Sequence, residues 1–118
     1  MKHLMLLILL LVTMSANAES FKYMYGGQEG RPSSTYIRLN EEPVHLNFLE
    51  DIEAIQVVYG DENVLFYVMA ATKKDDETIV AAMKKDGTKA VFSIRDKVTI
   101  FQIDNYIYVI TNIPKEYW

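Results

Sequence analysis

Short runs of alternating apolar and polar residues recur along the chain, and they restrict it to a fold that is rich in β-sheet. In residues 44–49, Val44, Leu46 and Phe48 fall on one face, and His45 falls on the other, which we expect to be solvated. A period of two is typical of a strand with one buried face. The same reading predicts strands over residues 21–25, 35–39, 44–49, 54–59, 64–71, 90–95, 98–103 and 106–111.

The sequences between these runs favour antiparallel pairing. Residues 60–63 have the composition of a four-residue hairpin loop. Asp104 and Asn105 both tolerate positive φ, so they predict a two-residue hairpin turn. Pro43 ends one strand and begins the next, because it cannot donate a hydrogen bond and it holds the preceding residue extended. We therefore expect hairpins at these turns within a mainly antiparallel sheet.

Residues 73–86 predict the single helix of the fold. Asp75 or Asp76 can cap its start, Lys84 suits its end, and Gly87 can terminate it. Its apolar stripe comprises Ile79, Val80 and Met83. The expected fold class is α+β, a mainly antiparallel sheet of about eight strands with one helix packed on it.

The first eighteen residues have the three-part layout of a cleaved signal peptide. A basic start is followed by the apolar run 4–12 and by small residues at Ala16 and Ala18. The run is too short to span a membrane, which needs about 20 apolar residues. We expect export, to the periplasm in a Gram-negative bacterium and otherwise by secretion. Residues 19–118 then form one small domain with no stable membrane insertion.

The charge and cysteine content restrict partners and stabilisation. Loss of Lys2 with the signal leaves 11 of the 12 basic residues against 16 acidic residues, a net charge of −5. An acidic domain lacks the basic surface that binds nucleic acid or anionic lipid. The chain has no cysteine, so the hydrophobic core has to stabilise the fold without disulfides.

The glycine-rich stretch 24–36 invites a phosphate-binding interpretation, which its spacing rejects. A P-loop has four residues between its glycines and then Lys, whereas Gly26 and Gly30 are separated by three and Arg31 follows. The simplest interpretation is a mobile connection between strands. The alternative is a recognition loop flanked by tyrosines. The candidate partner-binding residues are Tyr23, Tyr25, Gln28, Glu29, Arg31 and Tyr36.

No catalytic, cofactor-binding or metal-binding set is predicted. His45 is the one histidine of the mature chain, and no serine lies in a nucleophile elbow. The paired carboxylates are neighbours in sequence, which does not place two of them across a cleft. The stretch after Gly60 lacks the alternating oxygen ligands of a calcium loop. We therefore expect a protein that is not an enzyme.

The preferred function is a small exported domain that binds a protein. It would act as an inhibitor or immunity protein, or as an accessory factor of a secretion or surface-assembly system. One alternative is a carrier that holds a small apolar ligand or lipid between helix and sheet. An enzyme with an unrecognised site is the third. Self-association is a further alternative, since a small sheet with two apolar faces can use a second copy to cover one.

Overall fold

The computed structural model describes residues 18–118, so the predicted signal peptide lies outside the described residues apart from Ala18. These residues form one antiparallel sheet of ten strands. The strands are β1 (Ala18–Phe21), β2 (Tyr23–Gln28), β3 (Ile37–Arg38), β4 (Val44–Leu49), β5 (Ala54–Tyr59), β6 (Glu62–Lys74), β7 (Glu77–Met83), β8 (Lys89–Ile94), β9 (Val98–Ile103) and β10 (Tyr106–Thr111). Three short 3-10 turns are η1 (Ser33–Thr35), η2 (Glu50–Ile52) and η3 (Lys115–Tyr117).

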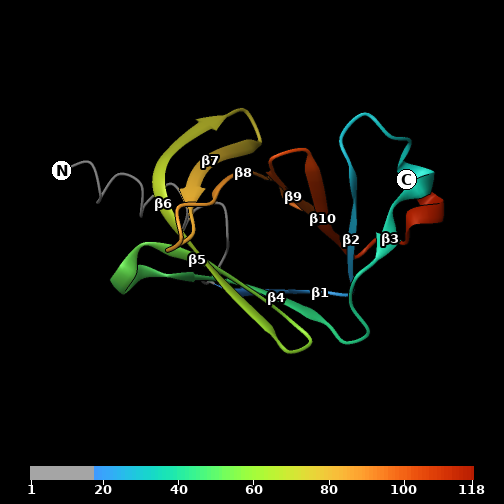
Figure 1. Cartoon of the computed structure of the whole chain (residues 1–118), viewed down its shortest axis with the longest axis horizontal. Helices are drawn as coiled ribbons and strands as arrows, with labels where there is room; N and C mark the ends of the chain where they lie inside the picture. Colours follow the sequence, from blue (N-terminus) through green and yellow to red (C-terminus); the bar gives the residue numbers. More distant parts are fainter. Residues whose placement is uncertain (1–17) are drawn as a thin grey trace.

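The sheet is curled into a half-barrel (Figure 1). Its strand order is β1-β4-β5-β6-β7-β8-β9-β10-β2-β3. Although β1 and β2 are separated only by Lys22, β1 pairs with β4 at one end of this order and β2 pairs with β10 and β3 at the other. The first segment of chain therefore changes partner at Lys22 and holds both ends of the curled sheet together.

The predicted α+β class is wrong, because the described residues contain no α-helix, and so no helix packs on the sheet. The segment 73–86 instead completes β6, turns at Asp75 and Asp76, and returns as β7. Lys74 pairs with Glu77 across this two-residue turn, and Asp75 has a φ of 56°. Two acidic residues that tolerate positive φ thus form a hairpin turn instead of a helix cap.

The burial of β7 explains why a strand forms there. Thr78, Val80 and Ala82 are buried, whereas Ile79 and Ala81 face outward, which is a period of two. The run of β-branched residues at its start also favours an extended backbone. Gly87, with a φ of 93°, lies in the turn between β7 and β8 and does not cap a helix.

Most predicted strands and the antiparallel sheet are confirmed. The strands over 44–49, 54–59, 98–103 and 106–111 have the predicted bounds. The segment 35–39 differs, because only Ile37–Arg38 forms a strand and η1 precedes it. His45 is exposed, as its place in β4 predicts. Among the described residues, no helix is long and apolar enough to cross a membrane.

The concave side of the curled sheet carries the hydrophobic core. A row of aromatic rings crosses it: Phe66 lies 5.2 Å from Phe92, and Phe92 lies 4.8 Å from Phe101 between ring centroids. Tyr108 stacks on Phe101 at 4.5 Å. Such ring pairs stabilise the fold beyond their buried area, which suits a domain without disulfides.

Candidate functional site

A cleft on the concave side of the sheet collects polar groups around tyrosine rings. We call it the tyrosine cleft, and it is lined by Leu39, Tyr59, Glu62, Tyr106 and Tyr108. Its volume is about 440 Å³. An inner hollow of about 170 Å³ shares Tyr59, Glu62 and Tyr108 with it. The hollow is otherwise lined by Val57, Val64, Phe66, Lys84, Phe101 and Ile103.

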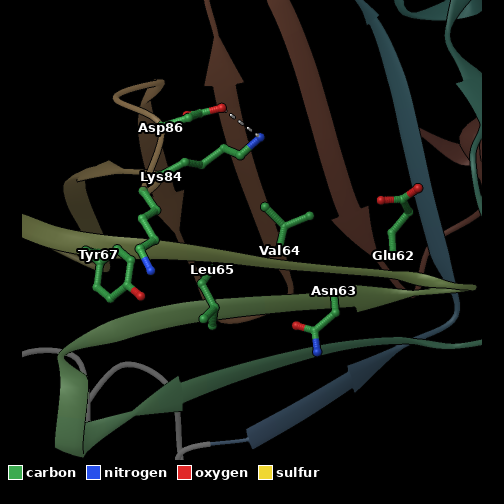
Figure 2. Close-up of a pocket in the computed structure, with 8 residues that line it drawn as sticks. Glu62, Asn63, Val64, Leu65, Tyr67, Lys84 and Asp86 are labelled. Carbon is green, nitrogen blue, oxygen red and sulfur yellow. Dashed lines mark ion pairs between the residues drawn. The ribbon is translucent and has the colours of Figure 1, made fainter.

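The β5–β6 hairpin supplies Tyr59 and Glu62 as a cross-strand pair. Tyr59 follows Val57 in the period of two that points into the core, and Glu62 precedes Val64 in the same way. Figure 2 shows Glu62 and Val64 on one side of β6, with Asn63 on the other. The hairpin therefore places a carboxylate on the concave side, where its neighbours along β6 are apolar.

The opposite wall comes from β10, which carries Tyr106 and Tyr108 on its concave side. Their ring centroids lie 4.9 Å apart, with the planes inclined at 60°. Gly26 of β2 pairs with Tyr108 in register. A Cβ atom at Gly26 would lie 2.6 Å from the Tyr106 hydroxyl, so any larger residue there would displace this ring. Gly26 thus makes room for one wall of the cleft.

The cleft favours neutral phenols and has an acidic rim. Burial raises the pKa of Tyr59, and the nearby Tyr108, Glu62 and Tyr106 raise it further. Burial also raises the pKa of Tyr108, with a smaller effect from Tyr106. Both phenols therefore remain hydrogen-bond donors at neutral pH. The arrangement can hold a ligand by ring contacts, hydroxyl hydrogen bonds and the charge of Glu62.

The cations beside the cleft come from the turn after β7. Figure 2 shows Lys84 above β6, with its ammonium directed toward Asp86. This ion pair measures 4.0 Å between Lys84 Nζ and Asp86 Oδ2. Lys84 and Lys85 line a neighbouring hollow together with Glu62. The positive charge of Lys84 is thus partly compensated before any ligand arrives.

The structure places the candidate partner-binding residues in two different environments. Tyr25 and Tyr36 are 6% and 8% exposed, and Tyr23 is half-buried. The Trp118 ring makes edge contacts with Tyr25 at 5.0 Å and with Tyr36 at 6.2 Å. These tyrosines therefore form an outer cluster covered by the C-terminal turn, separate from the tyrosine cleft.

The polar candidates are exposed beside β2. Gln28 ends β2, and Glu29 and Arg31 follow it in the loop before η1. The Glu29 carboxylate accepts a hydrogen bond of 2.6 Å from Gln102 Nε2, which ties the loop to β9. Gly26 and Gly27 lie in β2, so the glycine-rich loop is shorter than the sequence suggests.

His45 lies beside Ser20 on the exposed side of β1 and β4. The Ser20 hydroxyl and His45 Nδ1 are 2.9 Å apart. Within residues 18–118, no three His, Cys, Asp or Glu side chains lie close enough to hold a metal ion. His45 lies on the convex side, so it does not contribute to the tyrosine cleft.

Sequence reasoning missed Tyr59 and Glu62. Tyr106 and Tyr108 stand out in the sequence as strand tyrosines, but nothing in their spacing places them opposite the β5–β6 hairpin. The signal for Glu62 was available, since it is an acidic residue in phase with the buried positions Val64 and Phe66. The assignment of residues 60–63 to a loop removed Glu62 from the strand and concealed that phase.

Comparison with family models, curated proteins and solved structures gives no match, so the chain is assigned to no family.

Proposed function

We propose that this protein is an exported, non-enzymatic binding protein whose recognition site is the tyrosine cleft. One observation carries the proposal: Tyr59, Tyr106, Tyr108 and Glu62 converge from two hairpins onto one hollow on the concave side of the sheet. Pockets of roughly 300–1,000 Å³ with apolar walls and a few polar groups are typical of ligand sites. The tyrosine cleft, of about 440 Å³, is wide open to solvent, so the convergence of its side chains and not its volume supports the proposal.

The ring contacts support binding without large rearrangement. Tyr108 is held by stacking on Phe101, and Tyr106 is held against Gly26. Side chains that are fixed before binding lose little conformational freedom when the ligand arrives. A ligand would lie within the curled sheet, and not between a sheet and a helix.

Nuclear magnetic resonance titration tests this proposal. Isotope-labelled protein is titrated with small cationic, neutral and anionic compounds, and amide shifts are mapped. We expect at least one class to perturb the amides of Tyr59, Glu62, Tyr106 and Tyr108 together. The indole of Trp118 is an internal control, because it lies in the outer cluster. Shifts confined to other parts of the protein, or no shifts, would count against the cleft.

A protein partner is the second candidate function, and the outer face of the sheet supports it. Met69 of β6 is 60% exposed, and Val91 of β8 is 52% exposed. Ala81 of β7 lies between these strands, pairs with Val91 and is also exposed. Sedimentation velocity of the wild type and Val91→Glu tests whether a second copy covers this face. A monomer at all concentrations would contradict self-association.

A further inference from the structure

We propose that the tyrosine cleft takes an alkylammonium cation, that is, a positively charged nitrogen with an apolar surface. This inference rests on the proposed function and names its ligand class. The walls are the first reason. Cations bind over the faces of tyrosine rings because the ring quadrupole is negative there. Tyr59, Tyr106 and Tyr108 line the same hollow, and one face of the Tyr108 ring is covered by Phe101.

The charge around the cleft is the second reason. Glu62 lines the cleft itself, and Glu41, Glu42 and Asp61 line the hollow that adjoins it at Tyr59 and Glu62. Among residues 18–118, no cation is close enough to Glu62 to form an ion pair. Its carboxylate therefore remains available to a ligand.

Lys84 and Lys85 do not make the net charge around the cleft positive. Lys84 lines the inner hollow itself, and Lys84 and Lys85 both line the hollow between β6 and the β7–β8 turn, where Asp86 lies with them. The ammonium of Lys84 is paired with Asp86 at 4.0 Å (Figure 2). Five carboxylates and two ammonium groups thus line these hollows, which favours a cationic ligand over an anionic one.

The inner hollow is the third reason, because its apolar side chains favour a cation that carries apolar groups. Its apolar walls include Val57, Val64 and Ile103 beside the rings of Phe101 and Tyr108, and its charged groups are Glu62 and Lys84. A methylated or alkylated ammonium can place its apolar groups against these side chains. A small, strongly hydrated ion such as sodium would lose its water there without replacement.

Choline and its neutral isostere 3,3-dimethylbutan-1-ol test the inference on the wild-type protein. The two probes have nearly the same shape and differ in one positive charge. Binding is followed by amide shifts of Tyr59 and Tyr108, and dissociation constants are fitted for each probe. We expect choline to bind at least fivefold more tightly than the alcohol, and we expect Glu62→Gln to weaken choline binding about fivefold.

Asp51→Asn is the matched control, since it also removes one carboxylate. Asp51 lies in η2, which precedes β5, whereas Tyr59 is the last residue of β5. This variant should bind choline like the wild type. Equal binding of choline and the alcohol would overturn the cation inference while leaving the cleft as a binding site. Failure of every probe class at the cleft would overturn the proposed function as well.

Nα-acetyl-lysine amide distinguishes the source of the cation. If it binds at the cleft as tightly as choline, the site accepts the basic side chain of a partner protein. If choline binds and the lysine derivative does not, the ligand is a free small cation. Binding of neither would contradict the inference.

Discussion

The side-chain oxygen of Asn40 accepts a hydrogen bond of 2.8 Å from the backbone N–H of Met24. The amide nitrogen of the same side chain donates to the carbonyl oxygens of Lys22, at 2.9 Å, and of Glu42, at 2.7 Å. These bonds lie where β1 ends and β2 begins, so they replace the sheet pairing that is interrupted there. Asn40 therefore holds the point at which the first segment of chain changes partner.

Asn40→Ala should be among the most destabilising polar substitutions in the chain. Asn40 is 4% exposed, and its removal would leave the N–H of Met24 and two carbonyl groups without this partner. Such losses cost about 3 kcal/mol of unfolding free energy. Urea unfolding measures the change. Asn63→Ala, which removes an exposed amide from β6, is the control and should cost less than about 1 kcal/mol. Equal effects of the two substitutions would contradict this role of Asn40.

Gly27→Ala should destabilise the fold through the ring of Tyr36. A Cβ atom at Gly27 would lie 2.2 Å from Tyr36 Cδ1, and that ring is buried beneath Trp118. Overpacking of this kind costs about 1–3 kcal/mol. In a Tyr36→Ala background the same glycine substitution should cost much less, because the clash is gone. A double-mutant cycle measured by urea unfolding tests this coupling. Additive effects would show that Gly27 and Tyr36 do not interact as described.

Trp118→Ala should loosen the C-terminal turn. The indole contacts the rings of Tyr25 and Tyr36, and its N–H donates to the carbonyl oxygen of Ile113 at 2.9 Å. Loss of these contacts is expected to lower the unfolding free energy by about 1–2 kcal/mol. Tyr117→Ala is the control, since Tyr117 is 75% exposed. If both variants unfold at the same urea concentration, the turn does not contribute as proposed.

Protonation of the Glu77 carboxylate should lower the melting temperature of the protein at acidic pH. Its pKa is lowered first by the hydrogen bond from the Ser93 hydroxyl and then by Arg95. A pKa that is lower in the folded state stabilises the protein above the unfolded-state pKa, and this stabilisation is lost as pH falls through the folded-state pKa. Ser93→Ala raises the folded-state pKa and should reduce the fall in melting temperature between about pH 6 and pH 3. Carboxyl NMR of Glu77 checks the pKa directly, with Ser33→Ala as the control.

The strands were predictable where one face alone is buried. In β4, the buried residues Val44, Leu46 and Phe48 alternate with more exposed ones, so the period of two is unambiguous. The division of the first predicted strand, residues 21–25, between β1 and β2 was not predictable. It depends on the side chain of Asn40 and on the pairing of β1 with β4 and of β2 with β10. Those partners are distant in sequence.

The failed helix prediction shows the limit of local signals. Asp75 and Lys84 lie near the two ends of residues 73–86, and Gly87 follows, which are the positions these residue types favour at helix ends. The same residues also suit a hairpin turn and a second turn, and Ile79 and Val80 are apolar in either structure. The outcome was decided by β6 and β8, which pair with both edges of β7. Strand pairing of this kind is a tertiary interaction, and the sequence of the segment alone does not specify it.

The candidate site was predictable only in part. Tyr106 and Tyr108 lie in predicted strands, but the predicted partner-binding residues lie elsewhere: Tyr23, Tyr25, Gln28, Glu29, Arg31 and Tyr36. Of these, the C-terminal turn covers Tyr25 and Tyr36, whereas Gln28, Glu29 and Arg31 are exposed. The tyrosine cleft arises where the curl of the sheet brings β10 opposite the β5–β6 hairpin, and curvature is not encoded in the spacing of any one strand.

A crystal structure of the protein grown with choline tests the central claim most directly. The tyrosine cleft predicts density for the trimethylammonium group between Tyr59, Tyr106 and Tyr108, with Glu62 as the nearest carboxylate. An empty cleft that is open to solvent in the crystal, or choline bound only at another surface, would contradict it.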